Sequence, residues 1–212
     1  MINNEVNKEQ LILEAAEEEF LEKGYGNAKT VAIARRAGVS HSMLHYYFRT
    51  KGQLFQKVFK EKVQTLSQMF GVIFKQNTDF DSTLRLIIET QFMFVEKNPK
   101  LPMFIFNEIL SNKDNRDWAI KMLFPHLFPF LSVIEKMLSD EIAKGIVRPI
   151  TIWDLMMNII SMNISVFVAL PVLKDIFRLD SDEALENFLI QKRESNVQFI
   201  LNALRPSSIS KY

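Results

Sequence analysis

Apolar side chains recur every three or four residues along most of this sequence, and few residues interrupt them. The 212 residues include only six glycines and seven prolines, and 48% are hydrophobic. This spacing places apolar side chains on one face of a helix, while scarce glycine and proline leave little turn chemistry for a many-stranded sheet. The sequence therefore predicts an all-α protein, with one large domain or two smaller ones.

The spacing, together with capping and stop residues, predicts nine helices. We expect them at residues 7–24, 27–37, 40–48, 52–76, 81–97, 103–111, 117–144, 152–170 and 182–204. Asn7 opens the first and Gly24 ends it, while Asp180 and Glu183 open the last. Pro125 and Pro129 are expected to kink or divide the helix at 117–144, because proline lacks the N–H of the helical ladder.

Charge is distributed unevenly, although the formal net charge is only +1. Seven glutamates lie between residues 5 and 22, whereas no acidic residue occurs from Lys23 to Lys60, a stretch with eight lysines and arginines. Such a stretch makes a local positive surface suited to phosphate. The alternative is an ordinary solvated face, and charge alone favours that alternative.

The same stretch holds two short helices joined by Gly38 and Val39. Ser40 is a good N-cap for the second helix, in which Leu44 and Phe48 share one side. The polar or aromatic residues of that helix lie largely on the other side: His41, Ser42, His45, Tyr46 and Arg49. Two helices joined by such a turn form a helix-turn-helix, whose second helix presents side chains to base edges in the major groove.

Residues 12 to 54 carry a wider set of framework residues around this motif. They are Ile12-Leu13, Ala15-Ala16, Phe20, Gly24-Tyr25, Ile33-Ala34, Ala37-Gly38-Val39-Ser40, Leu44, Tyr46-Tyr47-Phe48, Lys51 and Leu54. This set resembles the DNA-binding region of the tetracycline-repressor (TetR) family of transcriptional regulators. The resemblance covers about the first quarter of the chain, and beyond it the likeness is only architectural.

The resemblance implies an N-terminal three-helix DNA-binding domain at residues 1–51 and a C-terminal helical ligand-binding and dimerisation domain at 52–205. A flexible tail is expected at 206–212. The implied DNA contacts are Lys29, Thr30, His41, Ser42, Met43, His45, Tyr46, Tyr47 and Lys51. Three departures leave the operator sequence open. Met43 stands where the family often has Thr, His45 where it commonly has Tyr, and Ala28 where Thr or Ser is frequent.

Two of these assignments have alternatives. The spacing of His41 and His45 suits a metal pair, but no cysteine is present, no Glu lies between them and His126 is remote. We therefore expect neither a metal site nor a cofactor. Tyr46 and Tyr47 could instead be core aromatics, and this alternative is stronger for Tyr47.

The C-terminal domain is rich in Phe and Met, which suggests that any ligand is hydrophobic or aromatic. The candidate pocket residues are Phe70, Phe74, Gln91, Phe92, Met103, Asn107, Trp118, Met122 and Asn163. Most of them could equally be ordinary core, and the polar ones could pair with each other or with backbone.

The last two helices, 152–170 and 182–204, are expected to form a homodimer as a four-helix bundle. A two-fold dimer would present two recognition helices to a palindromic operator. Lys192 to Asn196 interrupts the apolar pattern of the final helix without an evident reason. Residues 155–173 lack charge over a length that raises the membrane question, although a helix buried on several faces gives the same pattern.

The expected function is a ligand-responsive transcriptional regulator, a repressor released from its operator by a hydrophobic small molecule. We find no Gly-rich phosphate loop, Gly-x-Ser-x-Gly or His-Glu-x-x-His motif, so we do not expect an enzyme. The N-terminus lacks the pattern of a signal peptide, which favours the cytoplasm. The alternative is a helical interaction or ligand-binding protein that does not bind DNA.

Overall fold

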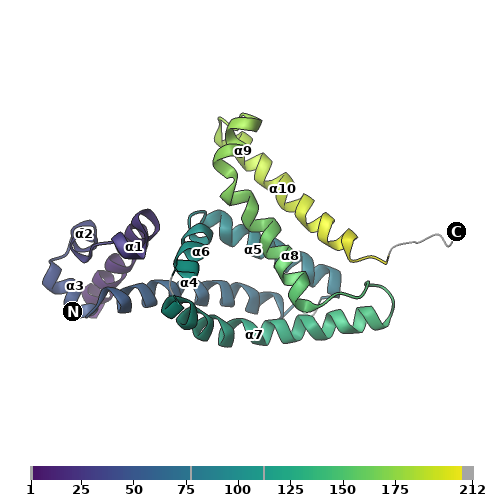
Figure 1. Cartoon of the computed structure of the whole chain (residues 1–212), viewed down its shortest axis with the longest axis horizontal. Coiled ribbons are helices and arrows are strands. Elements are labelled where there is room, and N and C mark those ends of the chain that lie inside the picture. Colours follow the sequence, from purple (N-terminus) through teal and green to yellow (C-terminus); the bar gives the residue numbers. More distant parts are fainter. Residues whose placement is uncertain (1, 77, 112, 207–212) are drawn as a thin grey trace. The chain divides into compact units, whose positions relative to one another are not determined.

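A computed structural model describes residues 2–76, 78–111 and 113–206 (Figure 1). These residues form ten helices, and within them there is no strand. The helices are α1 (Ile2–Asn27), α2 (Thr30–Arg36), α3 (His41–Tyr47), α4 (Lys51–Ile73), α5 (Phe80–Lys97), α6 (Leu101–Ser111), α7 (Lys113–Ala143), α8 (Ile152–Val168), α9 (Leu170–Phe177) and α10 (Asp182–Ala203). The all-α prediction is confirmed.

The chain divides into two compact units. Unit 1 comprises residues 1–65 and 103–123, and unit 2 comprises 66–102 and 124–212. The division passes through α4, α6 and α7, so α6 from Met103 onward belongs to the same unit as α1 to α3. These two compact units therefore do not coincide with the functional domains expected on either side of residue 51. That functional boundary stays a prediction.

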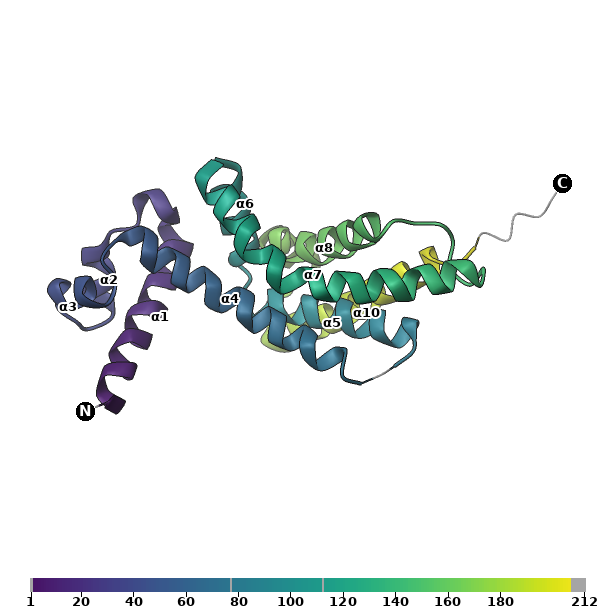
Figure 2. The same ribbon diagram turned by 90° about the horizontal axis from the view of Figure 1, so that it is seen from below.

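Unit 1 gathers α1, α2 and α3 around the N-terminal half of α4 (Figure 2). Its core contains the fully buried side chains of Ile12, Ile33, Leu44 and Leu54. One of these comes from each of the four helices, so every helix contributes its apolar face to one small core. The first helix begins at Ile2, earlier than the start expected at Asn7. Its predicted end is confirmed, because Gly24 has a φ of 74° that breaks the helical geometry.

Aromatic rings join α6 and the start of α7 to this core. Phe55 lies 5.8 Å from Phe104 and 6.0 Å from Trp118, measured between ring centroids. Phe59 lies 5.3 Å from Trp118 in an edge-on arrangement. Ring pairs at these distances contribute about 0.5–1.5 kcal/mol each beyond their buried area. The helix-turn-helix therefore shares its core with residues 103–123.

Unit 2 packs α5, α8 and α10 against one another, and α8 and α10 diverge from the end near α9 (Figure 1). Leu84 and Ile88 of α5, Leu155 and Ile159 of α8, and Val197 of α10 are almost completely buried in one cluster. The second half of α7 contacts the end of α4, where the Phe74 and Phe130 rings stack at 5.3 Å. Burial of this apolar surface supplies most of the driving force for folding of the unit.

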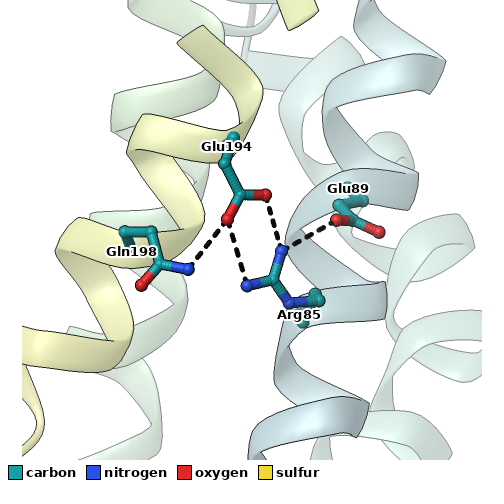
Figure 3. A network of polar contacts seen from close by, with 4 residues as sticks. All are labelled: Arg85, Glu89, Glu194 and Gln198. Carbon is teal, nitrogen blue, oxygen red and sulfur yellow. Dashed lines mark hydrogen bonds and ion pairs between the residues drawn. The ribbon is translucent and has the colours of Figure 1, made fainter. Parts of the chain in front are cut away.

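A polar network crosses the middle of unit 2. Asn163, which is fully buried, donates to the backbone oxygen of Ile88 at 2.9 Å and to Gln91 Oε1 at 2.5 Å. Asn196 Nδ2 donates to Asn163 Oδ1 at 2.9 Å. Beside it, Arg85 of α5 binds Glu194 of α10 through both terminal nitrogens of its guanidinium group, Nη1 and Nη2 (Figure 3). These contacts account for two residues of the polar interruption in the final helix, because Glu194 faces a polar partner on α5 and Asn196 faces one on α8.

Pro125 and Pro129 do not divide α7, which continues through both as one helix, so only the expected kink stays a prediction. Two other expectations need correction. The N-cap of α10 is Ser181, whose Oγ accepts the N–H of Ala184, and not Asp180. The helix expected at 152–170 ends at Val168, and the short helix α9 that follows it was not predicted.

Among the described residues, no single helix is long and apolar enough to cross a membrane. Only α8 and α9 taken together meet the length and composition criteria, and they are bent by 62°.

Candidate nucleic-acid interface

The predicted helix-turn-helix is present in α2 and α3. The turn is closed by hydrogen bonds from Gly38 N to Arg35 O at 3.2 Å and from Val39 N to Ala34 O at 3.0 Å. Gly38 has a φ of 67°, a conformation that glycine adopts without strain. Ser40 caps α3, because its Oγ accepts the N–H of Met43 at 3.1 Å. The cap expected from the sequence is confirmed.

The side of α3 opposite the core is open to solvent. Leu44 and Phe48 are buried, whereas His41, Ser42, His45 and Arg49 are exposed. Tyr46 is 76% exposed, which excludes a core role for it. Tyr47 is half-buried and packs against the unit 1 core, so the alternative interpretation of that ring has support. Met43 is also half-buried.

Hydrogen bonds link three of the expected DNA contacts to one another. Thr30 Oγ1 of α2 lies 3.0 Å from His41 Nε2, and His41 Nε2 lies 3.1 Å from His45 Nε2. The two imidazole rings meet edge to face with centroids 4.3 Å apart. His41 Nε2 offers either one N–H or one lone pair, so Thr30 and His45 share this one position. These contacts bring the two imidazoles and the start of α2 together on one exposed surface.

The cations of this region fall into two classes. Lys29, Arg35 and Arg49 are exposed and have no ion pair among the described residues. In contrast, Arg36 binds Glu18 at 2.9 Å and Glu22 at 3.0 Å. The hydrogen bond that Arg36 donates to Glu22 raises the pKa of the Arg36 guanidinium above its ordinary value. Cations of the first class are therefore the better candidates to attract phosphate.

Lys51 has a different environment from the one expected of a phosphate contact. Its Nζ donates to the backbone oxygens of Tyr25 at 2.8 Å, Gly26 at 3.1 Å and Ala28 at 3.0 Å. An ammonium group has three protons, so these carbonyls occupy its donor capacity. A direct phosphate contact from Lys51 would have to break one of these bonds. Its placement supports a structural role in joining α4 to the end of α1.

Sequence reasoning missed Glu108 of α6. Its Oε1 accepts the backbone N–H of Tyr25 at 2.8 Å, directly after the break at Gly24. The partners are separated by 83 positions in the sequence, and no local pattern marks such a pair. Glu108 thus holds the end of α1 from within unit 1.

The candidate pocket residues do not gather in one unit. Phe70, Phe74, Gln91, Phe92 and Asn163 belong to unit 2, whereas Met103, Asn107, Trp118 and Met122 belong to unit 1. Phe92 is fully buried against Phe167, and Gln91 pairs with Asn163. These three therefore have internal partners, in agreement with the alternative of core packing and mutual pairing. Their part in ligand binding stays a prediction.

A family model and several known proteins match part of this sequence. The family model described as "Bacterial regulatory proteins, tetR family" matches residues 12–58. Nucleoid occlusion factor SlmA of Vibrio cholerae is 27% identical over 116 residues, which are 54% of this chain and 59% of that protein. The chain thus matches less than two thirds of this relative. The fatty acid metabolism regulator protein of Bacillus subtilis is 25% identical over 138 residues, 65% of this chain and 69% of that protein.

The fold extends the likeness over the rest of the chain. The crystal structure of the transcriptional regulator FadR from Bacillus subtilis, in complex with stearoyl-CoA, superimposes with a TM-score of 0.67. The superposition covers 92% of this chain and 99% of that one, at 20% sequence identity. At this identity the match concerns the arrangement of the helices alone.

Proposed function

We propose that the chain is a ligand-responsive repressor of the TetR type that binds a palindromic operator as a homodimer, since its residues 12–58 match the model of that family. One observation carries the DNA-binding part of the proposal. The outward side of α3 exposes His41, Ser42, His45 and Tyr46, while Leu44 anchors the helix from behind. A recognition helix requires this division, because its outer side chains must enter the major groove.

The surrounding cations support the same orientation. Lys29 at the start of α2 and Arg49 after α3 flank the recognition helix, with no acidic residue between them in the sequence. Contacts from such cations to phosphate position a protein on the duplex, and contacts to base edges select the sequence. Ser42, His45 and Tyr46 are the candidates for base contacts.

The dimer is proposed to form through α8 and α10. The helix α8 exposes an apolar stripe comprising Trp153, Met157, Ile160 and Val168 at helical spacing. Phe199 of α10 is 63% exposed. Large apolar side chains gathered on one helix face mark an interaction surface, and a second copy of the chain fits a self-complementary interface.

The coupling to a ligand is proposed to pass through residues 103–123. These residues share the core of the helix-turn-helix through Phe104 and Trp118, and Glu108 binds the backbone after Gly24. A ligand that shifts α6 or the start of α7 would therefore displace the DNA-binding helices. It changes DNA affinity only if it binds one of the two conformations more tightly.

We propose that the effector is a hydrophobic small molecule, with an acyl chain as the first class to test. The apolar lining expected from the many Phe and Met residues supports this class. One structural relative, FadR of Bacillus subtilis, was solved in complex with stearoyl-CoA, and another relative is named a fatty acid metabolism regulator protein. These facts concern the relatives, and they make acyl compounds the first ligands to test on this chain.

Selection of bound duplexes from a random DNA pool tests the proposal. We expect enrichment of a palindromic sequence, whose affinity for the protein falls when a matching acyl-CoA is added. If the pure protein binds no duplex above the background of a neutral competitor protein, the helical interaction protein becomes the better assignment. If it binds DNA but no acyl compound changes the affinity, only the effector class is rejected.

A further inference from the structure

The lack of a third ligand in the sequence spoke against a metal site at His41 and His45, but their geometry in the structure favours one. We propose that the two residues form a binding site for a divalent transition-metal ion on the outer surface of α3. The two residues are one helical turn apart, and their Nε2 atoms lie 3.1 Å from each other. Metal–nitrogen bonds of about 2.0–2.1 Å that meet at about 90–110° place the two nitrogens about 2.8–3.4 Å apart. The pair therefore already has the separation that a shared metal ion requires.

The exposure of the two rings also suits a metal ion. Both imidazoles are exposed, so an ion can reach them from solvent without movement of the core. Each ring ligates in its neutral form through Nε2 and keeps its proton on Nδ1. The ion replaces the hydrogen bond between the rings and the one between Thr30 Oγ1 and His41 Nε2, which lie 3.0 Å apart.

The rest of the coordination shell comes from water. Among the described residues, no group of three or more His, Cys, Asp or Glu side chains has a metal-binding arrangement. No acidic residue occurs from Lys23 to Lys60, and the sequence has no cysteine. A site with two nitrogen ligands binds more weakly than a closed structural site, and it prefers Ni²⁺ or Cu²⁺ over Mg²⁺, which requires oxygen ligands.

Calorimetric titration of the untagged full-length protein with Ni²⁺ tests the site. The chain has only three histidines, so His126→Gln is a matched control that removes the remaining imidazole. We expect one ion per chain in the wild type and in His126→Gln. In His41→Gln or His45→Gln, loss of the chelate should weaken the affinity by about tenfold or more. Mg²⁺ should give no heat at the same concentrations.

Two results would overturn the proposal. One is equal Ni²⁺ affinity in the wild type and in the His41→Gln/His45→Gln double variant, since the ion would then bind elsewhere. The other is no Ni²⁺ binding by the folded wild type up to millimolar concentration. Both positions are exposed, and circular dichroism checks that each variant keeps its helices. The titration contains no DNA, so its failure leaves the proposed regulator function untouched.

Discussion

Lys51 donates a hydrogen bond to the backbone oxygen of Tyr25 at 2.8 Å, and its Nζ also lies 4.7 Å from the centroid of the Tyr25 ring. One side chain at the start of α4 thus engages both the backbone and the ring of the residue that follows the break in α1. Two further carbonyls, of Gly26 and Ala28, complete the contacts of the ammonium group. The end of α1 carries unpaired carbonyls, and a cation there satisfies them.

Replacement of Lys51 by alanine is expected to destabilise the protein by about 1–3 kcal/mol, because the three carbonyls no longer have a charged donor. Urea denaturation followed by circular dichroism measures the change. Lys60→Ala is the matched control, since Lys60 is exposed on the same helix. A phosphate-only role for Lys51 would instead leave stability unchanged and reduce the salt dependence of DNA binding.

Lys29 and Arg36 are expected to differ in DNA binding although both are cations of the helix-turn-helix. Lys29→Ala should weaken binding to every duplex and reduce the slope of log affinity against log salt by about 0.9 for each phosphate that Lys29 neutralises. Arg36→Ala should leave the slope unchanged, because Glu18 and Glu22 already pair with its charge. Fluorescence anisotropy over a range of salt concentrations measures both slopes. Equal slopes for the two variants would place the phosphate-binding cations elsewhere.

Most of the geometry of the proposed DNA-binding surface was predictable because its signals are local. Ser40 and the N–H it caps lie three residues apart, and the outward side of α3 follows from helical spacing around Leu44. The role of Glu108 was not predictable, since its partner Tyr25 lies 83 positions away. For the same reason, the sequence alone suggested a free cation at Lys51, whose carbonyl partners lie 23 to 26 residues earlier.

The C-terminal helices show another limit of local signals. In the sequence, only Pro171 indicates a break between α8 and α9, because the residues on both sides of the break form one uncharged, largely apolar run. The buried amides could be identified as polar residues within apolar stretches, but their partners lie on three different helices. Gln91 of α5, Asn163 of α8 and Asn196 of α10 meet only in the folded unit.

Asn163→Ala is expected to lower the free energy of unfolding by at least about 2 kcal/mol, since it leaves buried groups of Gln91 and Asn196 without this partner. Asn196 Oδ1 already has no hydrogen-bond partner among the described residues. This unpaired oxygen indicates that no further donor lies within reach to replace the lost amide of Asn163. Asn158→Ala on the same helix is the control. Asn158 is exposed, and its removal should change stability by less than about 0.5 kcal/mol. Urea denaturation curves that coincide for the two variants would contradict the role of the network.

Met157→Lys is expected to convert the proposed dimer to a monomer, because it places a charge in the apolar stripe of α8. Met157 is 62% exposed in the single chain, so the substitution leaves the core of unit 2 intact. Asn158→Lys introduces the same charge one residue along, outside the stripe, and should keep the dimer. Light scattering coupled to size-exclusion chromatography gives the molar mass of each protein. A wild type that is monomeric at every concentration would reject the interface.

The ion pair of Glu194 with Arg85 should make stability depend on pH in the acid range (Figure 3). The hydrogen bond from Arg85 lowers the pKa of Glu194 below its ordinary value of 4.5, and the amide of Gln198 acts in the same direction. Since the unfolded chain takes up this proton first as the pH falls, the pair stabilises the fold above about pH 4.5. That stabilisation is lost as the pH falls through the lowered pKa of the folded state.

Glu194→Gln isolates this effect. The Glu194 side chain is 50% exposed, so solvent screening should limit the difference in unfolding free energy at neutral pH to below about 1 kcal/mol. The difference between wild type and variant should be constant from neutral pH to about pH 5 and should decrease in more acidic solution. High salt at neutral pH should reduce it as well, because the pair is open to solvent. Chemical denaturation at a series of pH values measures the profile, and a difference that grows on acidification would show that the carboxylate is not stabilised in the folded state.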